Sequence, residues 1–135
     1  MAFDIREREH EGVAILELKG RLTVGEATRL REKVSEVSEA GQNRIILDLA
    51  AVDYIDSTGL GSLVICFTSI KKAGGALKLL NLNKRNIELL LLTKLSTIFE
   101  IFSDEQDAVN SYYPDREIKR FDILNFVREH KGEEG

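Results

Sequence analysis

The chain has 135 residues, of which 43% are hydrophobic and 31% are charged, and its net charge is −4. These values suit one globular domain with a hydrophobic core, and they argue against binding to the nucleic-acid backbone, which requires a cationic surface. No apolar run approaches the ~20 residues of a membrane span, and the N-terminus lacks the apolar region of a signal peptide. A single cysteine, Cys66, permits no internal disulfide. We therefore expect a cytoplasmic protein.

The first residues predict a β-hairpin. Phe3–Arg8 alternates apolar and polar residues and then becomes wholly polar, as an edge strand does, and Val13–Leu18 reads as a second strand. Glu11 and Gly12 form the turn, so the two strands should be antiparallel. Gly20 is expected to end the second strand.

A helix and a buried strand follow the hairpin. Thr23 and Glu26 have the spacing of a capping box, with Thr23 as the N-cap residue. Apolar residues then recur at intervals of three and four, which predicts an amphipathic helix that ends near Gly41. The nearly continuous apolar run Arg44–Leu49 is typical of a central strand. The apolar stripe of the helix consists of Ala27, Leu30, Val34 and Val37.

The second half of the chain continues to alternate helix and strand. This order predicts an α/β fold with a mostly parallel sheet, an antiparallel hairpin at one edge and about four helices. The predicted elements are a helix at Leu60–Ile70 ended by Gly74 and Gly75, a strand at Ala76–Leu80, a helix capped by Asn83, a strand at Phe99–Phe102 and a helix behind a capping box at Ser103–Gln106.

Pro114 ends this alternation, and we divide the chain into a domain of residues 1–112 and a C-terminal extension of residues 113–135. The extension is charged and partly amphipathic, which predicts some helix, and its last five residues are expected to fray. Its phenylalanines, Phe121 and Phe126, either pack back on the domain or form an interface with another molecule.

The segment Asp56–Gly61 is where the sequence suggests chemistry. Ser57 stands where a strand passes into a helix, behind an acid and ahead of glycines. Backbone N–H groups and the helix dipole favour negative charge at such a position, which therefore suits a phosphoryl acceptor or an anion site. Thr58 is a second candidate hydroxyl. The alternative is that Ser57 serves only as the N-cap residue of the helix.

Other kinds of chemistry lack the residues they need. A serine hydrolase requires a general base beside its serine, whereas the two histidines, His10 and His130, are predicted to be solvated surface residues. The sequence shows no Walker-type phosphate loop, no metal-ligand spacing and no pair of catalytic carboxylates. We therefore expect no catalytic residues, no metal site and no cofactor.

Together the motifs resemble the STAS domain of anti-sigma factor antagonists. The resemblance runs from about Phe3 to Tyr112 and implies a single-domain STAS-like fold followed by the C-terminal extension. The segments that carry it are Gly20–Leu22, Ile46–Leu49, Asp56–Gly61, Gly75–Leu79 and Phe99–Phe102.

By this resemblance, Ser57 would be phosphorylated by a serine kinase that is also an anti-sigma factor. The unphosphorylated protein would sequester that kinase, phosphorylation would release it, and a serine phosphatase would restore the binding form. The family usually has an aspartate near the position of Thr23, so the threonine is a departure in a partner-binding loop. The residues expected to bind the partner are Thr23, Asp56, Ser57, Thr58, Gly59, Leu60 and Gly61.

The alternative is a STAS domain that does not switch. Such a domain would be a scaffold or sensory subunit of a stress-response or transporter-associated complex, and Ser57 would be a cap. The extension or a sheet edge would then carry the function. The sequence leaves open whether residues 113–135 mediate self-association, and it does not name the sigma factor.

Overall fold

One five-stranded sheet forms the centre of the computed structural model, which describes residues 3–118 and 123–129. The first two strands are antiparallel and every later neighbouring pair is parallel. The predicted α/β fold, with a mostly parallel sheet and an antiparallel edge hairpin, is therefore confirmed. In spatial order, which is also chain order, the strands are β1 (Asp4–His10), β2 (Val13–Leu22), β3 (Arg44–Ile55), β4 (Ala76–Leu80) and β5 (Ile101–Phe102).

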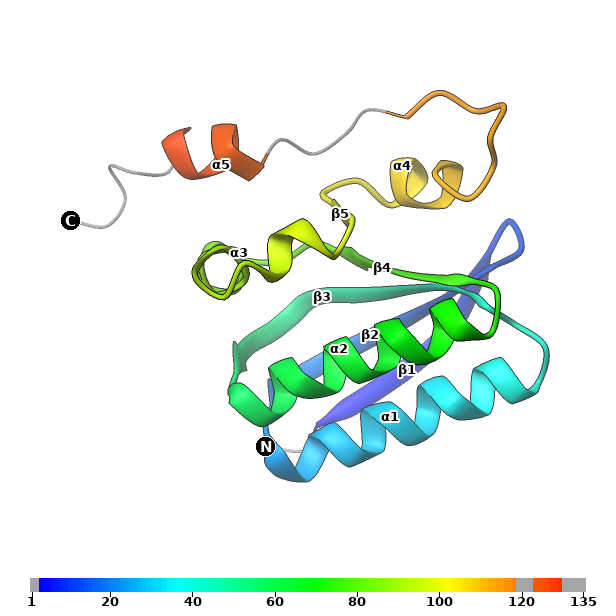
Figure 1. Ribbon diagram of the computed structural model, residues 1–135, viewed down its shortest axis with the longest axis horizontal. Helices are drawn as coiled ribbons and strands as arrows, with labels where there is room; N and C mark the ends of the chain where they lie inside the picture. Colours follow the sequence, from blue (N-terminus) through cyan, green and yellow to red (C-terminus); the bar gives the residue numbers. More distant parts are fainter. Residues whose placement is uncertain (1–2, 119–122, 130–135) are drawn as a thin grey trace.

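The helices cover both faces of this sheet. Because the parallel strands advance across the sheet in one direction and such crossovers are right-handed, α1 and α2 come to lie side by side on one face (Figure 1). The short helix α4 packs on the opposite face. The helices of the described residues are α1 (Val24–Glu39), α2 (Ser57–Lys72), α3 (Lys84–Leu92), α4 (Glu105–Asn110) and α5 (Ile123–Glu129), with a 3₁₀ turn at Leu95–Thr97.

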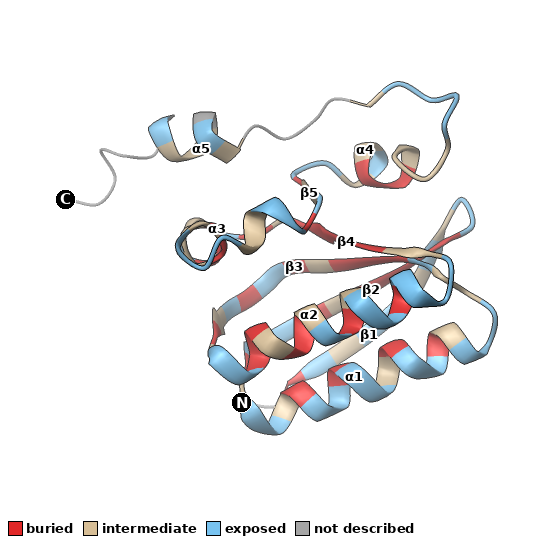
Figure 2. Ribbon diagram, in the orientation of Figure 1, coloured by how far each residue is buried: buried red, intermediate tan, exposed pale blue. Residues whose placement is uncertain are grey.

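Alternation along the strands divides the apolar side chains into two cores. The larger core lies between the sheet and α1, α2 and α3, and the smaller one lies under α4 (Figure 2). Leu16, Leu47 and Leu79 belong to the larger core, whereas Ile15 and Ile46, one residue away along their strands, belong to the smaller one.

Helix α5 of the C-terminal extension packs against the domain. Ile123, Phe126 and Val127 of α5 are partly buried against the larger core, and α5 lies alongside α3 (Figure 1). Phe126 therefore packs back on the domain, which is the first of the two predicted alternatives. Phe121 and the last five residues lie outside the described residues. The division of the chain at residue 112 stays a prediction.

Several strand boundaries differ from the prediction, among them those of β2, β3 and β5. Gly20 does not end β2, β3 continues past Leu49 to Ile55, and β5 is shorter than expected. In β3 one extra residue faces the step from Glu17 to Lys19 of β2, and another faces the step from Gly20 to Arg21. Such bulges interrupt the two-residue alternation by which a strand is recognised and increase its twist.

One predicted helix cap is confirmed, and another differs from the prediction by one position. Asn83 caps α3, as predicted, by accepting the backbone N–H of Asn86 at 2.8 Å. For α4 the N-cap residue is Asp104 rather than Ser103, and its carboxylate accepts the N–H of Asp107 at 2.9 Å. A carboxylate is the stronger acceptor because it also interacts favourably with the helix dipole.

Candidate functional site

Ser57 is the first residue of α2, directly behind the carboxyl end of β3. The N-cap residue is Asp56, whose carboxylate accepts the backbone N–H of Gly59 at 2.7 Å. The interpretation of Ser57 as the cap is therefore wrong. Ser57 and Thr58 are exposed, and neither hydroxyl forms a hydrogen bond within residues 3–118 and 123–129. The site thus presents two unengaged hydroxyls at a helix N-terminus.

Gly59 allows α2 to begin in direct contact with the end of β2. A Cβ at this position would lie 2.1 Å from the carbonyl oxygen of Leu22, far inside contact distance. The same carbonyl accepts the backbone N–H of Asp56 at 3.2 Å. Leu60 is buried in the larger core, whereas a Cβ at Gly61 would meet open space. Gly59 and Leu60 therefore fix the loop, and packing does not require a glycine at position 61.

Thr23 lies beside this loop because it follows Leu22 in the chain. It takes the N-cap position of α1, but its hydroxyl donates to the Glu26 carboxylate instead of accepting a backbone N–H. Thr23 therefore occupies the predicted N-cap position, but its side chain does not form the backbone hydrogen bond of a capping box. That hydrogen bond also holds the pKa of Glu26 below its ordinary value.

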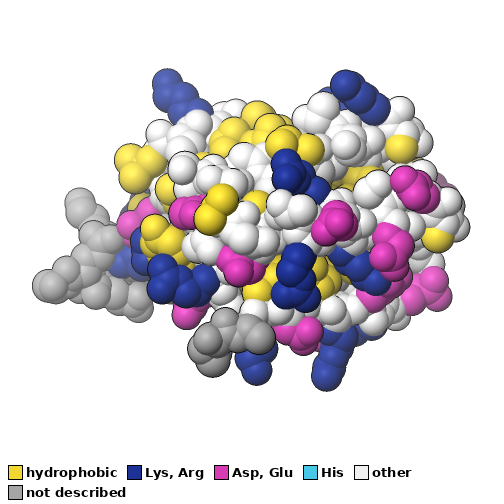
Figure 3. Space-filling model, turned by 90° about the horizontal axis from the view of Figure 1, so that it is seen from below, with side chains coloured by type: hydrophobic (Ala, Val, Ile, Leu, Met, Phe, Trp, Pro, Cys, Tyr) yellow, Lys and Arg dark blue, Asp and Glu magenta, His cyan; other side chains and the backbone are white. Residues whose placement is uncertain are grey.

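The sequence patterns did not predict two exposed apolar side chains on α1 and α2. Val24, at the start of α1, is 68% exposed, and Ile65 on α2 is 48% exposed. Viewed from the side of α1 and α2, hydrophobic side chains reach the surface in several places between charged ones (Figure 3). Val24 lies outside the apolar stripe of α1, and this position could have indicated from the sequence that its side chain is exposed.

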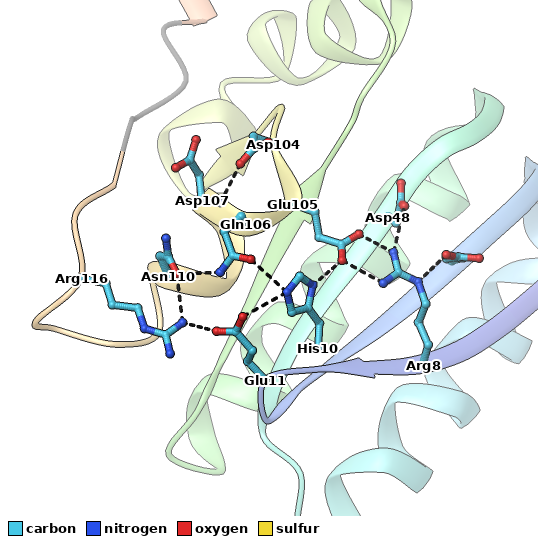
Figure 4. A network of polar contacts seen from close by, with 11 residues as sticks. Arg8, His10, Glu11, Asp48, Asp104, Glu105, Gln106, Asp107, Asn110 and Arg116 are labelled. Atoms are coloured by element: carbon cyan, nitrogen blue, oxygen red, sulfur yellow. Dashed lines mark hydrogen bonds and ion pairs between the residues drawn. The ribbon is translucent and has the colours of Figure 1, made fainter.

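A second group of polar residues joins the hairpin to α4 (Figure 4). The Glu105 carboxylate accepts hydrogen bonds from Arg8 at 2.9 Å and from His10 Nδ1 at 2.5 Å. The other His10 nitrogen, Nε2, lies 3.0 Å from Gln106 Oε1, and Arg8 also pairs with Glu17 at 2.5 Å. The His10 side chain is 26% exposed, so it lies at the surface, as predicted, but it is also hydrogen-bonded to α4. His130 lies outside the described residues.

These contacts shift two pKa values in opposite directions. The hydrogen bond from Arg8 is the largest cause that lowers the pKa of Glu105, to about 2, and the hydrogen bond to Glu105 raises the pKa of His10. Both groups are charged over a range of mildly acidic pH. Because Arg8 and His10 of β1 both bond to Glu105 of α4, the network is a clamp between these two elements.

Cys66 is 2% exposed and burial raises the pKa of its thiol to about 12, so it is a packing residue, as predicted. Residues 3–118 and 123–129 contain no cluster of three His, Cys, Asp or Glu side chains suited to a metal ion. None of the helices described is both long enough and apolar enough to cross a membrane.

Comparisons of the sequence and of the structure with known proteins lead to the same group of proteins. The sequence model of the STAS domain family matches residues 4–108. The anti-sigma-B factor antagonist of Bacillus subtilis is 37% identical over 109 residues, which cover 81% of this chain and 99% of that protein. The crystal structure of TM1081 from Thermotoga maritima superposes with a TM-score of 0.75 at 29% identity, over 80% of this chain and 93% of that one.

A more distant structural relative shows the same fold in two chemical states. The Bacillus protein SpoIIAA, solved in its unphosphorylated and phosphorylated forms, superposes with TM-scores of 0.61 and 0.63. Its sequence is 19% identical to this chain, and the superposition covers 82% of this chain and 96% or 98% of SpoIIAA.

Proposed function

This chain belongs to the STAS domain family, and we propose that it is an anti-sigma factor antagonist switched by phosphorylation of Ser57. The unphosphorylated protein binds a serine kinase anti-sigma factor in the cytoplasm. Phosphorylation releases that kinase, and a serine phosphatase restores the binding form. The protein is thus the substrate of a phosphoryl transfer and acts by binding.

The observation that carries the proposal is the exposed hydroxyl of Ser57. Asp56 caps α2, so the fold does not need the serine hydroxyl for the helix terminus. A kinase can therefore reach and modify Ser57 without first breaking a contact that holds the domain together. Thr58 offers a second exposed hydroxyl one residue later.

The physical effect of a phosphate differs between the domain and the interface. Phosphorylation adds about −1.5 to −2 charges at neutral pH. Within the domain, the first backbone N–H groups and the dipole of α2 stabilise that charge. A partner packed on the loop would instead have to desolvate it beside the Asp56 carboxylate. Modification should therefore break the complex while the protein stays folded.

The partner surface that we propose extends from the Ser57 loop to the start of α1. It includes Thr23 and the exposed Val24, because the Leu22 carbonyl ties their loop to Asp56. A partner that covered Val24 would remove its apolar side chain from water, which favours binding. The relatives named as anti-sigma factor antagonists support this kind of partner.

Phosphorylation can be tested by the intact mass of the protein after incubation with ATP and an extract of its own host. We expect one added phosphate on the wild-type protein and on Thr58→Ala, and none on Ser57→Ala. A phosphate that persists in Ser57→Ala and disappears in Thr58→Ala would move the switch to Thr58. No phosphate on any of them, in an extract with demonstrated kinase activity, would favour the non-switching scaffold.

A further inference from the structure

A polar hollow of about 380 Å³ lies at the same end of the sheet as Ser57. Its lining comes from three elements: Arg21 near the end of β2, Asp53 and Tyr54 near the end of β3, and Arg85 in the first turn of α3. In the sheet register Arg21 faces Tyr54, and the next pair along the strands leads directly into the Ser57 loop. A partner that covers this loop would therefore also reach the hollow.

Both arginines are held against the same aromatic ring. The Cζ atoms of Arg21 and Arg85 lie 4.6 Å and 4.3 Å from the centroid of the Tyr54 ring. Stacking of a guanidinium on an aromatic face restricts a long side chain while its N–H groups stay available. Binding an anion here would thus cost less conformational entropy than ordering two freely moving arginines.

Apart from this stacking on Tyr54, the two guanidinium groups have no polar partner in the described part of the chain. Neither Arg21 nor Arg85 forms a hydrogen bond or ion pair within residues 3–118 and 123–129, whereas Arg8 and Arg116 pair with carboxylates. Asp53, the acid in the hollow, forms no ion pair with either of them at 4.0 Å or less in that part of the chain. The hollow therefore carries two positive charges and one negative charge.

We infer that this hollow receives a carboxylate of the bound partner, an aspartate or glutamate side chain of the anti-sigma factor. The inference rests on the proposed function and specifies the chemistry of its interface. A guanidinium presents two parallel N–H groups that match the two oxygens of a carboxylate. One carboxylate would also balance the charges of Arg21, Arg85 and Asp53, which a phosphate dianion would not.

The test measures the affinity of the full-length, unphosphorylated protein for its purified anti-sigma factor by calorimetry. Arg21→Gln and Arg85→Gln should each weaken binding on the order of tenfold, since each removes a cation from an interfacial ion pair. Arg6→Gln is the matched control, because Arg6 is an exposed arginine on the edge strand β1 and does not line the hollow. It should bind as the wild-type protein does.

Asp53→Asn provides a test in the opposite direction. Removing this negative charge relieves repulsion of an incoming carboxylate, so the affinity should rise several-fold, which mere damage to the surface would not produce. Wild-type affinity in both arginine variants, or weaker binding by Asp53→Asn, would overturn the inference and leave the proposed function standing. If the wild-type protein bound no anti-sigma factor, the proposed function and the inference would both fall.

Discussion

Asp56 and Ser57 stand next to each other at the start of α2 and serve different purposes. The Asp56 carboxylate engages the helix N-terminus, and the Ser57 hydroxyl faces solvent without a partner in the described part of the chain. If Ser57 is phosphorylated, as we propose, the domain would keep its helix terminus in both states, because the cap is a different residue. Stability and regulation would then depend on separate side chains.

This separation can be measured as a difference in stability. Asp56→Ala removes the cap and should lower the free energy of unfolding by about 1 kcal/mol. Ser57→Ala removes an exposed, unengaged hydroxyl and should change it by less than about 0.5 kcal/mol. Urea unfolding of the two variants and the wild-type protein gives both values. Equal losses would show that Ser57 contributes to capping after all.

The two glycines of the loop should respond in opposite directions to the same substitution. Gly59→Ala places a Cβ against the Leu22 carbonyl and should destabilise the protein by about 1–3 kcal/mol. Gly61→Ala meets open space within a helix and should stabilise it by about 0.5–1 kcal/mol. Urea unfolding checks both values, and a loss at position 61 as large as that at 59 would contradict the packing described.

At the scale of elements, the network around Glu105 fastens α4 to the hairpin, and its strength should depend on pH. The folded-state pKa of Glu105, about 2, lies below its ordinary value of 4.5, so its contribution is complete above about pH 4.5 and is lost as the pH falls toward 2. The pKa of His10 is raised above 6.5, so its contribution is complete below 6.5 and is lost as the pH rises through the folded value.

The clamp should therefore contribute most between about pH 4.5 and 6.5. Glu105→Gln keeps the shape of the side chain and removes the charge shared by Arg8 and His10. We expect the difference in unfolding free energy between wild type and Glu105→Gln to be largest near pH 6 and smaller near pH 3 and near pH 9. Urea unfolding at those pH values measures it. A difference that does not vary with pH would contradict the ionic character of the clamp.

Sequence patterns predicted the order of elements because each is a local signal. Alternation in β1, the apolar stripe of α1 and the run that opens β3 each lie within one short segment. The end of β3 was missed since its bulges exist only relative to β2. The N-cap residues of α2 and α4 are aspartates that lie one position from the serine considered in the sequence. Serine and aspartate both suit an N-cap, so the sequence alone does not show which of two neighbours takes that position.

At the scale of the whole molecule, α5 closes one side of the larger core. Phe126 packs against that core, while Leu124, two residues earlier, is 66% exposed. Phe126→Ala should therefore lower the free energy of unfolding by about 1–3 kcal/mol, and Leu124→Ala should change it by less than about 0.5 kcal/mol. Urea unfolding of both variants is the measurement. Equal, small effects would mean that α5 is not a stable part of the fold.

Contacts between distant parts of the chain set the limit on predicting the site. The Ser57 loop was recognisable because its residues are consecutive. The hollow was not, since Arg21, Tyr54 and Arg85 come together only when β2, β3 and α3 are in place. In the same way His10 meets Glu105, 95 residues away, through an arrangement that no local pattern encodes.

The central claim is that phosphorylation of Ser57 controls partner binding. Its most direct test is the affinity of the purified anti-sigma factor for the unphosphorylated protein and for the protein phosphorylated at Ser57, measured side by side by calorimetry. We expect phosphorylation to weaken binding on the order of 100-fold or more, because a new negative charge must be desolvated at the interface. Circular dichroism should show that both forms stay folded. Equal affinities for two folded forms would contradict the claim.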